Sequence, residues 1–159
     1  MRKTVEELVP LLQGSVYRAA FAVCRDRQEA ENITQETFLA YIQKPREFES
    51  LDHLRAWMLR VAINKGKDFC RAFWRRKWVN LDAAAAAIPF EAPQDGEVFK
   101  AVMGLPARQR AVIYLFYYED RPIREIASIL GAREGTVKSL LHRARQQLKI
   151  TLQEGWNDE

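Results

Sequence analysis

The stretch PIREIASILGAREGTVKSLLHRARQQLK, residues 122–149, decides the fold of the C-terminal part of this 159-residue chain. Apolar residues recur at helical spacing in its first part, at Ile123, Ile126, Ala127 and Leu130, and in its second part, at Val137, Leu140, Leu141, Ala144 and Leu148. Between the two parts, Gly131 is well placed to end one helix and Thr136 can help begin the next. Two helices joined by a short glycine-containing turn predict a helix-turn-helix, with an ordinary helical hairpin as the alternative.

The second helix of this stretch is one-sided in charge. After Glu134 it has no acid up to Lys149, while basic side chains stand at Lys138, His142, Arg143, Arg145 and Lys149. Surface helices usually mix charges to gain i,i+4 pairs, and phosphate binding explains why this helix does not. A recognition helix places its N-terminal residues at base edges in the major groove. The candidate DNA-reading residues are Arg133, Glu134, Thr136, Lys138, Ser139, His142 and Arg143. For His142, a surface position without a specific contact is the alternative.

Helix-start signals also dominate the N-terminal part. Thr4 with Glu7, and Asp26 with Glu29, have capping-box spacing. They predict a first helix that reaches about residue 24 and a second that reaches about residue 42.

Ser50 or Asp52 can cap a third helix, inside which Gly66 is expected to weaken or bend the chain near Asn64. No stretch alternates convincingly with period two, so we predict no strands. The expected fold class is all-α.

The composition changes sharply at VNLDAAAAAIPFEAPQDG, residues 79–96. Five successive alanines favour a helix, but prolines and a glycine follow them and would break it. The segment also contains acids and not a single basic residue. We predict that this segment is a flexible linker between two small helical domains, residues 1–78 and 97–159. The second domain is expected to open with a helix near Glu97 and to continue with one that has Pro106 as its first residue.

A second basic surface is expected on the third helix, because residues 53–77 hold eight Lys or Arg against a single acid, Asp68. One side carries the apolar stripe, and another side gathers Arg60, Asn64, Lys67, Arg71 and Trp74. Cations beside an aromatic ring suit a single nucleic-acid strand, whose backbone is attracted and whose bases can stack. The alternative is a solvated basic helix with Trp74 tucked into the core.

The second helix has one apolar residue out of place. Leu39 lies opposite the inward-facing set, among Asn32, Gln35 and Glu36. A lone exposed leucine is ordinary. An apolar residue ringed by amides and a carboxylate also indicates a docking surface for another protein's helices.

Several classes of function are disfavoured by what the sequence lacks. Two cysteines, Cys24 and Cys70, and two histidines, His53 and His142, lack the spacing of a metal site. There is no Gly-rich phosphate loop and no recognisable nucleophile–base pair. We therefore expect no enzyme, no catalytic residue, no metal, no cofactor and no small-molecule substrate. Without a signal peptide or an apolar run of ~18 residues, we expect a cytoplasmic protein that does not insert into a membrane.

Three stretches together resemble the extracytoplasmic-function (ECF) group of RNA polymerase sigma factors. DRQEAENITQETFLAY, residues 26–41, resembles the family's helix that binds the polymerase clamp. FESLDHLRAWMLRVAINKGKDFCR, residues 48–71, resembles its −10 element helix, and residues 105–149 resemble its −35 element domain. The pattern TVKS-x-x-x-RAR-x-x-L after EIA is the most specific part of the likeness.

The resemblance implies a role for each surface. The clamp of core RNA polymerase would be bound by Asn32, Gln35, Glu36, Phe38 and Leu39. The −10 element of promoter DNA would be bound by Arg60, Asn64, Lys67, Asp68, Arg71 and Trp74, with Asn64 capturing a flipped base. Residues 106–118 would meet the polymerase flap, and an anti-sigma factor is a further expected partner. The alternative is a free-standing helix-turn-helix regulator that acts without the polymerase.

Overall fold

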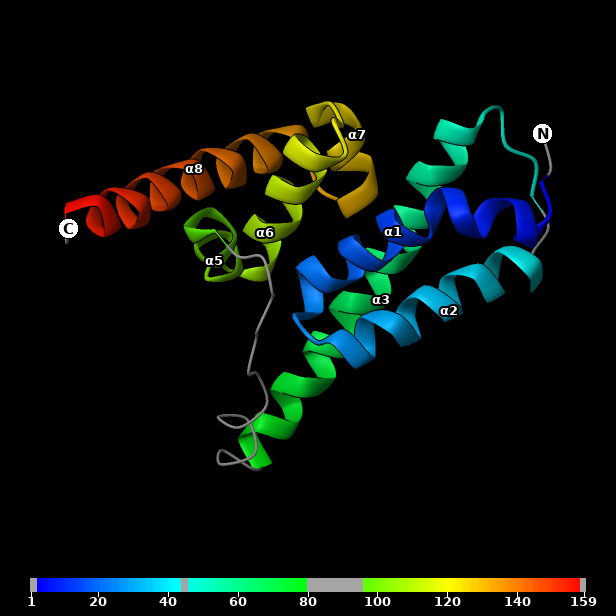
Figure 1. Ribbon diagram of the computed structural model, residues 1–159, viewed down its shortest axis with the longest axis horizontal. Coiled ribbons are helices and arrows are strands. Elements are labelled where there is room, and N and C mark those ends of the chain that lie inside the picture. Colours follow the sequence, from blue (N-terminus) through cyan, green and yellow to red (C-terminus); the bar gives the residue numbers. More distant parts are fainter. Residues whose placement is uncertain (1–2, 44–45, 80–95, 158–159) are drawn as a thin grey trace. The chain divides into compact units, whose positions relative to one another are not determined.

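The computed structural model describes residues 3–43, 46–79 and 96–157, except for the side chains of residues 73–79 and 154–157. The chain divides into two compact units, Met1–Pro89 and Phe90–Glu159. Within the described ranges every regular element is a helix, which confirms the all-α prediction (Figure 1). The expected linker, residues 79–96, lies almost wholly outside the described residues, so its bounds stay a prediction.

The first unit consists of α1 (Val5–Cys24), α2 (Arg27–Gln43) and α3 (Leu51–Val79). The predicted capping box of α1 is present, because the Glu7 N–H donates to the Thr4 hydroxyl at 3.4 Å and the Thr4 N–H donates to the Glu7 carboxylate at 3.3 Å. At the start of α3 the His53 N–H donates to Ser50 Oγ at 3.0 Å. Ser50 therefore caps α3, of the two candidates that the sequence left open.

Helix α1 packs against both α2 and α3, and the core lies along these contacts. The largest fully buried side chains of this unit are Leu8, Leu12, Val16, Ile33, Leu54, Met58, Leu59 and Ile63. Helix α3 continues through Gly66 without a break, and the expected weakening or bend near Asn64 stays a prediction. Gly66 is buried, and a Cβ atom there would lie 3.0 Å from Cβ of Val23. The glycine allows α3 to approach α1 closely.

The second unit contains α5 (Glu97–Met103), α6 (Ala107–Ile113), the π-helix η1 (Tyr114–Tyr118), α7 (Ile123–Leu130) and α8 (Glu134–Asn157). The start of α5 at Glu97 confirms the prediction. Pro106 precedes α6 with an extended ψ of 150°, so this helix begins one residue later than expected. Helix α8 packs against α5, α6 and α7, with Leu115, Ile126, Val137 and Ala144 in the core.

Residues 106–118, which the resemblance assigns to the polymerase flap, do not form one regular α-helix. The chain widens into η1, where the Glu119 N–H donates to the Tyr114 carbonyl, five residues back, at 3.2 Å. Widening of this kind adds a residue to the turn and shifts the side chains that follow. The aromatic run Tyr114–Tyr118 is therefore arranged differently from a regular α-helix.

Candidate nucleic-acid and protein-binding surfaces

The turn between α7 and α8 has the geometry that the sequence predicted. Gly131 has a left-handed φ of 65°, and its N–H donates to the Ser128 carbonyl at 3.3 Å. The Ala132 N–H donates to the Ala127 carbonyl at 2.9 Å, which completes a Schellman motif. Helix α8 then begins at Glu134, so Thr136 lies inside its first turn and does not start it.

Helix α8 separates its buried and exposed sides cleanly. Val137, Leu140, Leu141 and Ala144 are buried in the core of the unit, as their helical spacing predicted. The candidate DNA-reading residues lie on the other sides: Arg133, Glu134, Lys138, Ser139, His142 and Arg143 are exposed, and Thr136 is half-buried. We define these seven residues as the α8 surface. Its base-reading role stays a prediction.

Two arginines of this unit are buried, and the sequence reasoning missed both. Arg121 is only 4% exposed, and its guanidinium Nη1 lies 3.0 Å from the Glu125 carboxylate in the first turn of α7. Its backbone N–H donates to the Leu115 carbonyl at 2.9 Å, which links the segment just before α7 to η1. Arg110 is also buried and donates to the Leu105 carbonyl. The i,i+4 spacing of Arg121 and Glu125 was the signal available in the sequence.

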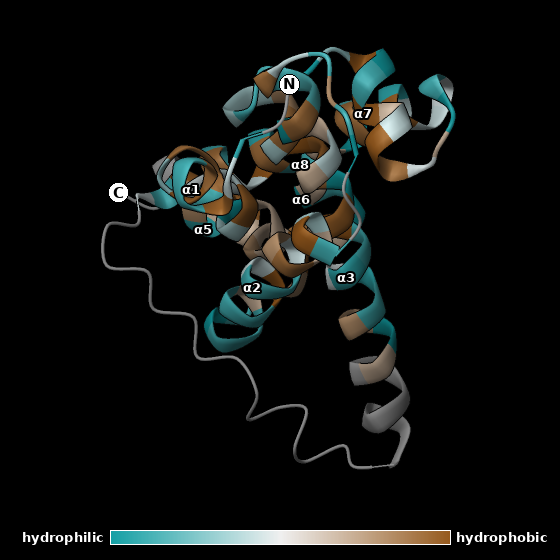
Figure 2. Ribbon diagram, turned by 90° about the vertical axis from the view of Figure 1, so that its right-hand side faces the viewer, coloured by the Kyte–Doolittle hydropathy of each residue, from teal (hydrophilic) through white to brown (hydrophobic). Residues whose placement is uncertain are grey.

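The second basic surface lies on α3. Arg60, Asn64, Asp68 and Arg71 are exposed, Lys67 is half-buried, and Figure 2 shows hydrophilic residues along the visible outer side of this helix. Arg71 lies 3.5 Å from the Asp68 carboxylate, so this acid moderates the positive potential at one end. We define these five residues as the α3 surface. The Trp74 side chain lies outside the described part of the chain, and its two interpretations stay open.

On α2 the structure divides the predicted docking residues into two groups. Gln35, Glu36 and Leu39 are exposed and Asn32 is half-buried, with Leu39 51% exposed. Phe38, in contrast, is 7% exposed and packs in the core. Its ring therefore does not belong to the docking surface, because the inward side of α2 is the one that meets α1 and α3.

One further residue extends this predicted docking surface. Ile42 is exposed one turn beyond Leu39, a position that the sequence reasoning did not single out. The Glu36 carboxylate lies 3.3 Å from the Lys65 ammonium group, which links α2 to α3. We call Asn32, Gln35, Glu36, Leu39 and Ile42 the α2 surface.

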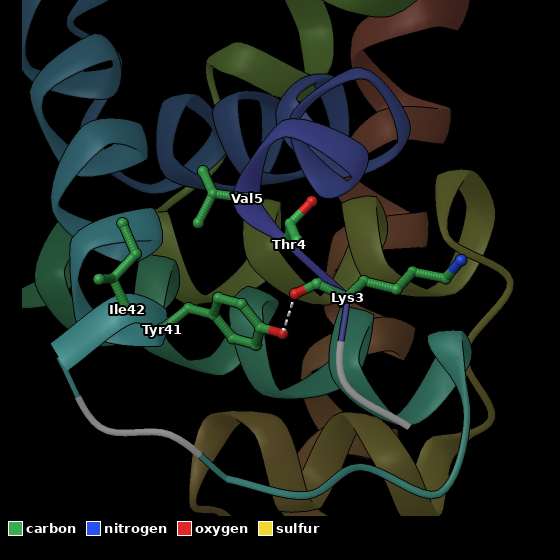
Figure 3. Close-up of a pocket in the computed structure, with 5 residues that line it drawn as sticks. All are labelled: Lys3, Thr4, Val5, Tyr41 and Ile42. Carbon is green, nitrogen blue, oxygen red and sulfur yellow. Dashed lines mark hydrogen bonds between the residues drawn. The ribbon is translucent and has the colours of Figure 1, made fainter.

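A small hollow of about 360 Å³ lies between the start of α1 and the end of α2 (Figure 3). Its lining residues are Lys3, Thr4, Val5, Tyr41 and Ile42. The Tyr41 hydroxyl donates to the Lys3 carbonyl at 2.6 Å. The hollow joins two helix ends, and its lining offers no nucleophile–base pair.

Cys24 and Cys70 are free thiols; Cys24 is buried and Cys70 is half-buried. Burial raises the pKa of the Cys24 thiol to about 11, and its Sγ donates to the Asp26 carbonyl at 3.5 Å. Cys70 Sγ donates to the Val23 carbonyl at 3.4 Å. Among the described residues, His, Cys, Asp and Glu form no group of three or more that could hold a metal ion. None of the described helices is long and apolar enough to cross a membrane.

Comparisons with known proteins assign each unit to a family. Residues 8–76 match the family Sigma-70 region 2, and residues 96–148 match Sigma-70, region 4. The chain is 31% identical to the ECF RNA polymerase sigma factor SigM of Bacillus subtilis, over 98% of this chain and 99% of that protein. It is 33% identical to the ECF RNA polymerase sigma factor SigL of Mycobacterium tuberculosis, over 87% of this chain and 83% of the relative.

Solved structures give the same result. The sigma factor RpoE of Bartonella quintana, solved in complex with the anti-sigma factor NepR, matches with a TM-score of 0.72 and 25% identity. The match covers 93% of this chain and 96% of that one. CnrH, solved with the cytosolic domain of CnrY, shares the fold with a TM-score of 0.62.

Proposed function

Because the chain belongs to the ECF group of RNA polymerase sigma factors, we propose that its two units divide promoter recognition between paired and melted DNA. The α8 surface binds the −35 element as duplex, and the α3 surface binds the −10 element after the strands have parted. The α2 surface docks on the clamp of core RNA polymerase, which supplies the catalysis in the cytoplasm. The observation that carries this proposal is the presence of two unlike basic surfaces on separate units.

At the −35 element the chemistry follows from donor and acceptor patterns in the major groove. The Lys138 and Arg143 side chains can donate to guanine or to phosphate, and Glu134 can accept from the cytosine amino group. All three are exposed on the first turns of α8, where a recognition helix meets base edges. This arrangement supports sequence reading by the α8 surface.

At the −10 element the polymerase complex must hold bases that have left the stack. Extruding a base costs a few kcal/mol, and contacts to the unpaired base offset that cost. The exposed Asn64 amide both donates and accepts hydrogen bonds, as base recognition requires. With both readers on one polymerase, weak individual contacts act together.

We also propose that a protein inhibitor of the anti-sigma class binds this chain. The support is the similarity to RpoE, whose structure contains NepR. The rival function, a free-standing regulator with a helix-turn-helix, requires DNA-directed control without polymerase binding.

In vitro transcription with core polymerase tests the proposal. Adding the chain to core polymerase and genomic promoter fragments should start specific transcripts that core polymerase alone does not make. Gel filtration should show the chain eluting with core polymerase. A chain that binds DNA specifically, never associates with the polymerase and starts no transcript would establish the rival function instead.

Substituting Arg143→Ala should weaken binding to −35 duplex by about 1–3 kcal/mol, because an exposed guanidinium that reads guanine would be lost. Fluorescence anisotropy of labelled promoter duplex, with single-base variants of the −35 element, measures both affinity and sequence preference. An unchanged affinity and preference would remove Arg143 from the readers. The exposed Gln146 on the same helix, changed to alanine, is the matched control.

Substituting Asn64→Ala should slow promoter opening by about tenfold while duplex −35 binding stays unchanged, since one hydrogen-bonded base contact is lost. Permanganate reactivity of −10 thymines in the holoenzyme complex measures the opening. Gln13→Ala, at an exposed amide residue of α1 outside the three defined surfaces, is the control and should leave promoter opening unchanged. Equal opening rates for the Asn64 variant and the parent protein would exclude base capture by this side chain.

A further inference from the structure

Arg145 of α8 is held by side chains far away in the sequence. Its Nε donates to the Tyr117 hydroxyl at 2.6 Å. Its guanidinium carbon lies 5.2 Å from the centre of the Phe116 ring and 5.5 Å from the centre of the Tyr117 ring. Both distances are within the range of cation–π attraction. A hydrogen bond and two ring faces therefore fix a side chain that would otherwise sample many rotamers.

The π-helix η1 provides these rings. Phe116 and Tyr117 are consecutive residues, and their rings meet edge to face with centroids 5.0 Å apart and an interplanar angle of 76°. A pair arranged in this way offers two differently oriented surfaces to one guanidinium. Tyr117 is 50% exposed, so the cluster lies at the surface of the unit. π-helical turns occur frequently at functional sites. In this one, two aromatic rings contact the guanidinium of Arg145.

The position of Arg145 on α8 relates it to the base-reading end. Seven residues separate it from Lys138, so both side chains lie on nearly the same face, about 10.5 Å apart along the axis. The major groove is about 12 Å wide, so a residue two turns beyond Lys138 on the same side of the helix can reach the sugar–phosphate backbone at the edge of the groove. The next exposed basic residue in this direction is Lys149, one turn further along.

The electrostatics around Arg145 leave it available to an anion. Among the described residues no carboxylate lies within ion-pair distance of it, unlike Arg121 and Arg71. The bond to Tyr117 uses Nε alone, and a guanidinium carries its other donors on the two terminal nitrogens. A planar group with those donors remaining matches the geometry of a phosphate.

We propose that Arg145 binds a backbone phosphate of duplex DNA and that Tyr117 is its positioning residue. This inference rests on the proposed −35 binding by α8 and adds a contact outside the α8 surface. Tyr117 and Phe116 hold the guanidinium in the binding orientation before DNA arrives, which reduces the ordering cost of binding. Since the contact is to phosphate, it contributes to affinity for any duplex and to its salt dependence, without sequence preference.

The test uses the full chain, a labelled 20-base-pair duplex of arbitrary sequence, and fluorescence anisotropy at several salt concentrations. Arg145→Gln should lower the slope of log affinity against log salt by about one and weaken binding roughly tenfold near 0.1 M salt. Tyr117→Phe keeps the ring and deletes only the acceptor. It should weaken binding severalfold with the slope unchanged, and it should cause no further loss in the Arg145→Gln background.

The controls separate this contact from general charge effects and from folding. Lys100→Gln removes one exposed charge of the same unit on α5 and should change the slope far less. Thermal unfolding by circular dichroism confirms that each variant is folded. Where the free chain binds the duplex too weakly to measure, the reconstituted holoenzyme replaces it.

Two results would overturn the inference: an Arg145→Gln slope equal to that of the parent protein, or a Tyr117→Phe loss that is undiminished in the Arg145→Gln background. Either result would contradict the Arg145 contact and would not contradict the proposed function in transcription initiation. Conversely, a chain that shows the predicted slopes but no association with core polymerase would contradict the proposed function and not this contact.

Discussion

Leu39→Asp is expected to reduce the affinity of the chain for core RNA polymerase by at least 30-fold, which corresponds to about 2 kcal/mol. Leu39 is half-exposed at the centre of the α2 surface, with Gln35 and Glu36 one turn before it and Ile42 one turn after it. An apolar anchor ringed by polar groups is the usual anatomy of a binding hot spot. A carboxylate placed there would lose its water in the complex without gaining a partner.

The matched control for this variant is Leu11→Asp. Leu11 is 50% exposed and lies on α1, so the same change is made at the same exposure on another helix. Because neither leucine is in the core, both variants should unfold at nearly the parent temperature. Surface plasmon resonance against immobilised core polymerase compares the two. If Leu39→Asp binds as tightly as Leu11→Asp, the α2 surface is not where the polymerase docks.

Gly66→Leu is expected to lower the free energy of unfolding of the first unit by about 2–3 kcal/mol, through overpacking of the core. A Cβ atom alone would already lie 3.0 Å from two carbons of Val23, and leucine adds three more carbons behind it. Helix propensity favours leucine over glycine by less than about 1 kcal/mol, so the steric term decides the sign. Urea unfolding followed by tryptophan fluorescence measures the change.

Gly14→Leu is the contrasting variant. Gly14 is an exposed residue inside α1, and the nearest atom to a Cβ there belongs to the flexible Arg18 side chain. Here propensity acts almost alone, so stability should rise by a few tenths to about 1 kcal/mol. Combining Gly66→Leu with Val23→Ala should cost less than the sum of the two single changes, because Val23→Ala removes Cγ1, one of the two carbons that the new side chain would meet. Additive losses would show that α1 and α3 do not meet at this point.

Local chemistry made most of the helix boundaries predictable. The capping side chains of Thr4 and Ser50, the left-handed Gly131 and the start of α5 at Glu97 all act within one turn of the residue concerned. Helical periodicity likewise separated the buried stripe of α8 from its basic sides. It also separated Leu39 from the inward-facing residues of α2, since both distinctions depend only on spacing along one helix.

Contacts between residues far apart in the sequence were not predictable from patterns along a single helix. The position of the Arg145 side chain depends on Tyr117, 28 residues earlier, and on a π-helix that no short-range pattern predicted. Gly66 is read as a weak point along its own helix, whereas across the core it is the place where Val23 of α1 comes close. Arginines are usually exposed, but the fold buries Arg110 and Arg121 with hydrogen-bonding partners.

By itself, the sequence determined the all-α class, the turn between α7 and α8, the exposed basic side of α8 and the apolar residue on α2. Each of these depends on residues within a turn or two of one another, where backbone preference and periodicity act directly. Only the tertiary structure decided which glycine is a contact point, which arginines are core residues and which rings hold Arg145. Those outcomes depend on the distance between helices, a quantity that packing sets and that spacing along the chain does not contain.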